Sequence, residues 1–218
     1  MGHLRHDFPS LRSTTYNYTY VCSMAAHQKK WREELGNTEF LVSGKNPSGP
    51  SNLPSAISDL EEASAVFMMR WQQQDYQRAG LVTEKALQLF DFISNQILRR
   101  KVERKGLGNY NGSPFEAQMA VSCGSGVTAT SFAEQNNMVT AGAGNGNIVI
   151  GARTQIQLTM DRLLNKIKHR NGLMNFREVN GHHIFVICTD HTTGGPEGIY
   201  EFDVVDFCAQ CKLISAVL

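Results

Sequence analysis

Two apolar runs near the end of the chain constrain its fold most strongly. Residues 182–190 read HHIFVICTD and residues 199–207 read IYEFDVVDF, and the stretch TTGGPEG lies between them. Apolar runs rich in β-branched and aromatic residues, joined by a Gly/Pro-rich turn, are typical of a β-hairpin. We therefore predict two antiparallel strands here, with the following KLISAVL adding further β structure.

Helical periodicity dominates residues 58–106, whereas residues 1–50 show no sustained periodicity. One helix begins near Ser58, where Ser58 and Glu61 have the spacing of a capping box, and runs to a break at Gly80. A second helix carries apolar residues at i, i+4, i+7 and i+11 from Ala86 and ends at RRKVERK, just before Gly106. Basic residues in a last turn complement the helix dipole, although the same run could instead bind phosphates.

The remaining segments complete an α+β protein. We predict a glycine turn and a helix within AQMAVSCGSGVTATSFAEQNN, a short strand over 148–151 and a third helix over 154–170. A helical N-terminal half should then pack on a C-terminal antiparallel sheet. The expected divisions are an extended arm and linker (1–54), a helical hairpin (55–106) and an α+β region (107–218) that forms one domain with the hairpin.

Composition narrows the class of protein. The hydrophobic fraction of 41%, the charged fraction of 19% and the net charge of +1 describe a globular chain and disfavour nucleic acid as its partner. No stretch reaches the roughly 18 apolar residues of a membrane span, and the polar N-terminus lacks the apolar core of a signal peptide. Five irregularly spaced cysteines predict reduced thiols. We expect a cytoplasmic or otherwise intracellular protein whose partners are protein substrates or subunits.

One set of residues could carry thiol chemistry. A cysteine nucleophile needs a lowered pKa, a histidine within hydrogen-bonding reach and a third group that orients the histidine. Cys123 precedes Gly-Ser-Gly and a predicted helix, whose N-terminus would lower the pKa of the thiol. His182 and His183 open one strand of the predicted hairpin and Asp203 lies on the other, so either histidine could meet the carboxylate.

These stretches also resemble a known family. SCGSGVTATSFAEQ, HHIFVIC and GIYEFDVVD together resemble the papain-like cysteine hydrolases, most closely bacterial effector and toxin domains with a Cys–His–Asp triad. The resemblance covers about residues 109–207 and implies a protease- or deamidase-like enzyme without a cofactor, which would act in the host cytoplasm. It implies these roles: Cys123 as nucleophile, His183 as base, Asp203 as orienting acid and Gln118 as a contributor to an oxyanion hole.

Four other interpretations remain open. CGSGVTA resembles the persulfide-carrying loop of rhodanese-type sulfurtransferases, although the two helices upstream do not follow the strand–helix alternation of that family. Cys208 and Cys211 form a C-x₂-C pair that could ligate zinc, together with Cys188 and the neighbouring histidines. The Tyr-rich N-terminus and Gly/Asn-rich loops favour a structural subunit of a virion or other assembly, forming homo-oligomers. The two helices could instead recruit a partner as a binding module.

Overall fold

A single antiparallel sheet organises the molecule. The computed structural model describes residues 52–218, so nearly all of the predicted arm and linker lies outside the described residues. The strands follow the order β2-β1-β5-β4-β3. Their bounds are Ser122–Thr128 (β1), Ile156–Thr159 (β2), Arg170–Val179 (β3), His182–Asp190 (β4) and Pro196–Asp203 (β5). The predicted α+β class, with helices preceding an antiparallel sheet, is confirmed.

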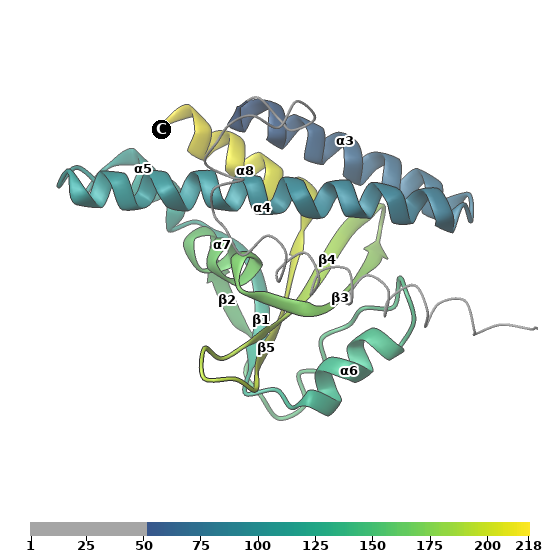
Figure 1. The fold of residues 1–218 in the computed structure, drawn as a ribbon. Coiled ribbons are helices and arrows are strands. Elements are labelled where there is room, and N and C mark those ends of the chain that lie inside the picture. The colour runs from purple at the N-terminus through teal and green to yellow at the C-terminus, as the bar shows by residue number, and fades with distance from the viewer. Residues whose placement is uncertain (1–51) are drawn as a thin grey trace, which may run out of the picture.

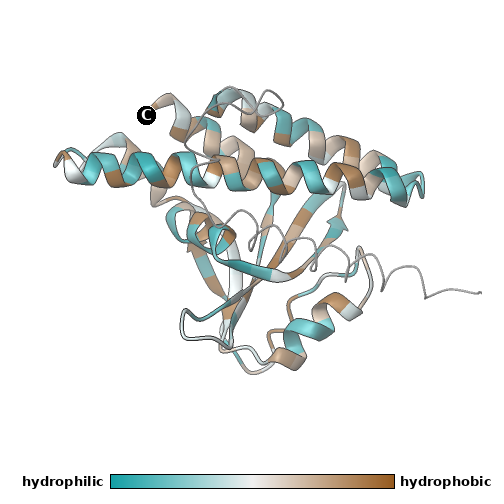
Figure 2. Cartoon of the chain, viewed as in Figure 1, coloured by the Kyte–Doolittle hydropathy of each residue, from teal (hydrophilic) through white to brown (hydrophobic). Residues whose placement is uncertain are grey.

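Helices cover both faces of this sheet (Figure 1). Their bounds are Leu53–Gln72 (α3), Tyr76–Gly106 (α4), Pro114–Met119 (α5), Phe132–Thr140 (α6), Met160–Lys168 (α7) and Val204–Ala216 (α8). The two long helices α3 and α4 form a hairpin that lies with α8 over one face, whereas α6 lies on the other side. Apolar and polar residues alternate along α3 and α4 (Figure 2), as expected for helices that bury one face. No helix in the described part of the chain is long and apolar enough to cross a membrane.

An aromatic cluster joins the helical layer to the sheet. Phe90 of α4 stacks on Phe185 of β4 at a ring distance of 5.3 Å. It also meets Phe202 of β5 edge-on at 5.5 Å and Phe207 of α8 at 5.4 Å. All four side chains are buried in one apolar core to which α3, α5 and α7 also contribute. The helical hairpin and the sheet therefore share their main core.

The helical hairpin forms as predicted, but its boundaries differ. Asn52 caps α3, because its side-chain oxygen accepts a hydrogen bond from the backbone N–H of Ser55, so the helix begins before the predicted Ser58. The turn between the helices lies at residues 73–75, and the predicted break at Gly80 lies inside α4. The end of α4 at Gly106 agrees with the prediction.

The basic run at the end of α4 is largely engaged in contacts within the protein. Arg99 and Arg100 both pair with Glu103 at 2.9 Å. Lys101 pairs with Asp161 of α7 at 2.5 Å, and Arg104 donates to the main-chain oxygens of the last two residues. These contacts favour the helix-end interpretation of this run over the phosphate-binding one.

Several secondary-structure predictions after residue 120 are wrong. Residues 148–151 do not form a strand. The predicted helix over 154–170 is strand β2 followed by the shorter helix α7, because Thr159 caps α7 through the backbone N–H of Arg162. KLISAVL continues the helix α8, which begins directly after Asp203 ends β5.

Candidate functional site

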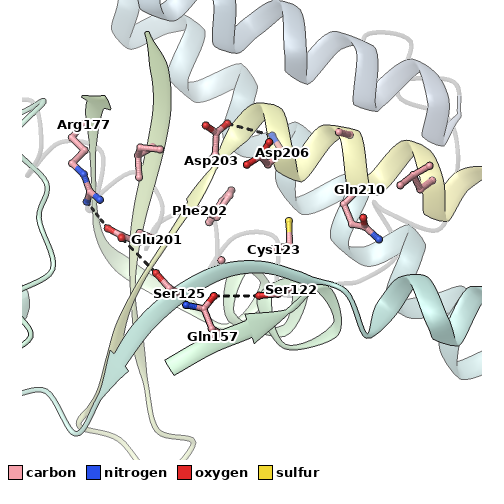
Figure 3. Close-up of a pocket in the computed structure, with 14 residues that line it drawn as sticks. Ser122, Cys123, Ser125, Gln157, Arg177, Glu201, Phe202, Asp203, Asp206 and Gln210 are labelled. Atoms are coloured by element: carbon pink, nitrogen blue, oxygen red, sulfur yellow. Dashed lines mark hydrogen bonds and ion pairs between the residues drawn. The ribbon is translucent and has the colours of Figure 1, made fainter. Parts of the chain in front are cut away.

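A pocket of about 520 Å³ opens between the sheet and α8 (Figure 3). The sheet side is mostly polar, whereas α8 also brings apolar side chains. Residues 122–125 of β1 form its floor, together with side chains from β2, β3, β4 and β5. Two of the four predicted site residues, Cys123 and Asp203, line this pocket, whereas His183 and Gln118 do not.

Cys123 lies in a strand, which contradicts the predicted helix start. It is the second residue of β1, at a point where the pairing of β1 with β2 shifts register between Ser122 and Gly124. Such bulges re-aim side chains. The sulfur of Cys123 points from β1 toward α8 (Figure 3). Cys123 therefore does not open a helix, since the next helix along the chain, α6, begins only at Phe132.

The glycines around Cys123 serve packing and not a turn. A Cβ on Gly124 would lie 2.8 Å from the carbonyl oxygen of Glu201, and one on Gly126 would lie 2.6 Å from that of Ile199. Both distances are shorter than real Cβ contacts allow. The Gly-Ser-Gly sequence thus lets β1 approach β5 closely. Its extended backbone also differs from the anion-cradling loop that the rhodanese-like interpretation requires.

Asp203 organises the rim of the pocket. It ends β5 and caps α8, because its Oδ1 accepts hydrogen bonds from the backbone N–H groups of Val205 at 2.7 Å and Asp206 at 3.3 Å. Its other oxygen, Oδ2, lies 2.5 Å from Nδ1 of His182. The side chain of Asp203 is only 11% exposed, whereas that of His182 is 58% exposed.

The contact with Asp203 fixes which nitrogen of His182 holds the proton. A carboxylate only accepts hydrogen bonds, so Nδ1 is the donor, and neutral His182 keeps the lone pair on Nε2. His182 also shares a strand face with Ile184, which lines the pocket, because residues two apart on a strand point to the same side. The structure thus joins Asp203 to the first of the two histidines.

His183 belongs to the opposite face of the sheet. Its Nδ1 lies 2.8 Å from Oγ of Ser64 in α3, and its ring stacks on Phe67 at 4.7 Å. Burial lowers the pKa of His183 to about 4, although the carboxylate of Asp203 acts in the other direction. The ring is therefore a neutral part of the core between sheet and helices, and it does not face the pocket that contains Cys123.

The surroundings of Cys123 favour the protonated thiol. Burial, together with the nearby carboxylates of Asp206 and Asp203, raises its pKa to about 12. The sequence-based expectation of a lowered thiol pKa is thus reversed. Within the described residues, Cys123 makes no hydrogen bond to a histidine.

Gln118 lies near the end of α5 and does not line the pocket. Nε2 of Gln210 donates to the main-chain oxygen of Gln118 at 2.8 Å and to its side-chain oxygen at 3.0 Å. Gln210 itself lines the pocket and is buried. Gln118 therefore positions Gln210 and holds α5 against α8. It does not point a free amide into the pocket, as the predicted oxyanion role would require.

An ion pair that no sequence motif signalled forms another wall. The guanidinium of Arg177 in β3 pairs with the carboxylate of Glu201 in β5, across the intervening strand β4 (Figure 3). Glu201 also accepts a hydrogen bond from Ser125 of β1 at 3.5 Å. Only the pairing register places these residues on one face, which is why sequence alone could not identify them.

Residues 52–218 contain no group of three or more His, Cys, Asp or Glu side chains placed to hold a metal ion. Cys208 and Cys211, the pair considered for zinc, are buried in the core on α8. Burial raises the pKa of Cys208 to about 12 and that of Cys211 well above its usual value, which disfavours the thiolates that zinc requires.

Comparisons with known proteins give no relative for this chain: no family model, no curated protein and no solved structure matches it. Its function must therefore be inferred from the side chains of the pocket.

Proposed function

We propose that the chain is a thiol-dependent hydrolase or acyl-transfer enzyme in which Cys123 is the nucleophile, His182 the base and Asp203 the orienting acid. The observation that carries this proposal is the 2.5 Å contact between Nδ1 of His182 and Oδ2 of Asp203, at the rim of the pocket that Cys123 lines. A histidine held in this way by a carboxylate keeps Nε2 available as a proton acceptor. His182 thus takes the role that the family resemblance gave to His183.

The proposed reaction begins from a neutral thiol. With a pKa of about 12, on the order of one thiol in 10⁵ is ionised at pH 7, so a resting thiolate would be rare. His182 must therefore remove the proton as the sulfur attacks. Cys123 and His182 lie on β1 and β4 with β5 between them, so their backbones are about 10 Å apart or more. We propose that the proton crosses this gap through one water molecule or after a rotation of the exposed imidazole.

Each step then conserves atoms and charge. Nε2 accepts the thiol proton while the sulfur bonds to the carbonyl carbon of an amide, which gives a tetrahedral oxyanion. When this collapses, the C–N bond breaks, the leaving nitrogen takes the proton from Nε2, and a thioester remains on Cys123. Attack by water or by an amine, with its proton passing through Nε2 to the sulfur, releases the acyl group and restores the thiol.

Acylation by a small activated ester tests this proposal without knowledge of the substrate. Incubation with p-nitrophenyl acetate at pH 7.5 should add one acetyl group, located on Cys123 by intact-mass and peptide mass spectrometry. His182→Ala should lower the acylation rate by roughly 100-fold, the lower range of general base catalysis. His191→Ala is the matched control, because His191 is an exposed histidine on the loop after β4 and should leave the rate unchanged.

Two outcomes would contradict the proposal. One is acylation of Cys123 at the same rate in the wild type and the His182→Ala variant, which would mean that the imidazole does not act as a base. The other is an absence of acylation at Cys123 while the exposed side chains of the protein do react. Cys123→Ala should remove the adduct without loss of the folded circular dichroism spectrum.

A second candidate function, binding without catalysis, is favoured by the carboxylates near Cys123. Two carboxylates beside a protonated thiol suit a pocket that binds a cationic group without chemistry. In that case Cys123 would be a packing residue of β1, and the His182→Ala and Cys123→Ala variants would both keep full ligand affinity.

A further inference from the structure

We infer that the pocket selects substrates with a lysine or arginine side chain beside the reacting amide, and that Asp206 is the residue that determines this specificity. This inference rests on the proposed function of the pocket and adds its substrate class. It depends on which carboxylates of the pocket are already engaged and on the shape of the α8 wall.

The charge of the pocket is unbalanced. Three carboxylates line it against the single guanidinium of Arg177. Glu201 is neutralised by that guanidinium, and both oxygens of Asp203 are engaged by His182 and by the start of α8. Asp206 is exposed, and among the described residues its carboxylate has no hydrogen bond or ion pair. Its charge therefore remains available to a ligand.

The charge of Asp206 also affects the pKa of the reactive thiol. It is the larger of the two charges that raise the pKa of Cys123, and both residues line the same pocket. A cation bound to Asp206 would cancel this charge. Because the same charge disfavours the thiolate, a cationic substrate would lower the pKa of Cys123 when it binds.

The wall formed by α8 suits the aliphatic part of a basic side chain. Asp206, Ala209 and Leu213 line the pocket and follow one face of the helix at spacings of three and four residues. Leu213 is 53% exposed, so its side chain is accessible to a ligand. From Asp206 to Leu213 the helix rises about 10 Å, enough to lay a lysine stem on Ala209 and Leu213 with its ammonium at Asp206.

The size of the pocket is compatible with this ligand. About 520 Å³ lies within the roughly 300–1,000 Å³ of typical ligand sites and holds one long side chain together with its flanking amide. The polar floor of β1 and β2, which includes Ser125 and Gln157, can pair with the peptide groups.

Binding can be measured apart from chemistry with the full-length Cys123→Ala variant. A fluorescein-labelled peptide, Gly-Gly-Lys-Gly-Gly, is compared by anisotropy with the same peptide carrying norleucine, which keeps the stem of lysine but lacks its charge. The lysine peptide should bind at least about threefold more tightly at low salt, as expected for a partly exposed ion pair, and Asp206→Asn should abolish this preference. Glu84→Gln is the matched control, because Glu84 is an exposed carboxylate of α4 that does not line the pocket.

The possible outcomes separate this inference from the proposed function. Equal affinities for the two peptides, or an unchanged preference in Asp206→Asn, would overturn the inference even if Cys123 is acylated by the activated ester. A lysine preference that depends on Asp206, found together with a failure of Cys123 acylation, would support the inference and leave a binding pocket without catalysis. If Glu84→Gln weakens the preference for the lysine peptide as much as Asp206→Asn does, the preference reflects the general surface charge of the protein. That result would also overturn the inference.

Discussion

At the residue scale, the alternation of side chains along β4 determines which histidine can act as a base. His182 and His183 are neighbours, but successive residues of a strand point to opposite faces. His182 meets Asp203 beside the pocket, whereas His183 meets Ser64 inside the core. The sequence predicted that a histidine and Asp203 would meet through the hairpin. It could not choose between the histidines, because that choice depends on which face of the sheet the helices cover.

The buried position of His183 predicts a pH dependence of stability. Its pKa falls from 6.5 in the unfolded chain to about 4 in the folded protein. Between these values the unfolded state binds a proton that the folded state does not, so the free energy of unfolding decreases as the pH drops from 6.5 toward 4. The loss from this residue amounts to about 3 kcal/mol.

Urea denaturation at pH 7.0 and pH 5.0 measures this effect. Carboxylates also titrate at low pH, so the informative quantity is the difference between proteins. His183→Leu should lose less stability than the wild type between the two pH values, whereas His191→Leu, at an exposed histidine, should match the wild type. An identical pH dependence in wild type and His183→Leu would show that His183 is not buried in its neutral form.

At the scale of elements, the largest errors of prediction concern residues whose role depends on a neighbour. Gly-Ser-Gly is typical of a turn, yet β1 uses these glycines to pass close to β5. DVVD continues an apolar run that predicts a strand, yet Asp203 caps α8 with Asp206 three residues later, which is a helix-start pattern. The apolar run masked this signal. The two helices of the hairpin were predicted because their periodicity is local, although the start of α3 and the turn between the helices were misplaced.

The packing of β1 on β5 predicts a large effect of a single methyl group. Gly126→Ala would place a Cβ 2.6 Å from the carbonyl oxygen of Ile199, a backbone atom that cannot move without disturbing the pairing of β5. We expect a loss of about 1–3 kcal/mol or more in unfolding free energy, as for overpacked cores. Gly106→Ala is the control, because nothing lies within 4 Å of a Cβ at the end of α4 and alanine favours the helix.

Chemical denaturation of both variants measures this change in unfolding free energy. If Gly126→Ala and Gly106→Ala both have the same unfolding free energy as the wild type, β1 and β5 do not approach each other as closely as described. The candidate site would then lose its basis, since Cys123 reaches the pocket through this strand.

At the scale of the whole molecule, the class of fold could be predicted and the pocket could not. Periodicity distinguishes helices from strands one segment at a time, which is enough for an α+β protein. The pocket instead combines residues from six elements that are up to 91 positions apart, such as Ser122 and Leu213. Their meeting depends on the strand order, which has β5 next to β1 and which no local pattern encodes.

The shared core predicts that the helical hairpin and the sheet unfold together. Trp71 of α3 contacts Phe176 of β3 at a ring distance of 4.7 Å, so its fluorescence reports on the hairpin–sheet interface. In a Trp31→Phe background, which leaves Trp71 as the single tryptophan, fluorescence and far-UV circular dichroism should give the same urea midpoint.

Truncation of the central aromatic residue sharpens this test. Phe90→Ala removes the ring that contacts β4, β5 and α8, and should cost about 3–5 kcal/mol while moving both midpoints equally. Leu81→Ala, at an exposed position of the same helix, should move neither. If Phe90→Ala shifted the fluorescence midpoint but left a separate circular dichroism transition in place, the hairpin would be an independent unit. The pocket is lined by the sheet and by α8, and α4 does not line it. If the hairpin and the sheet unfold together, the geometry of the pocket depends on α4 through the shared core.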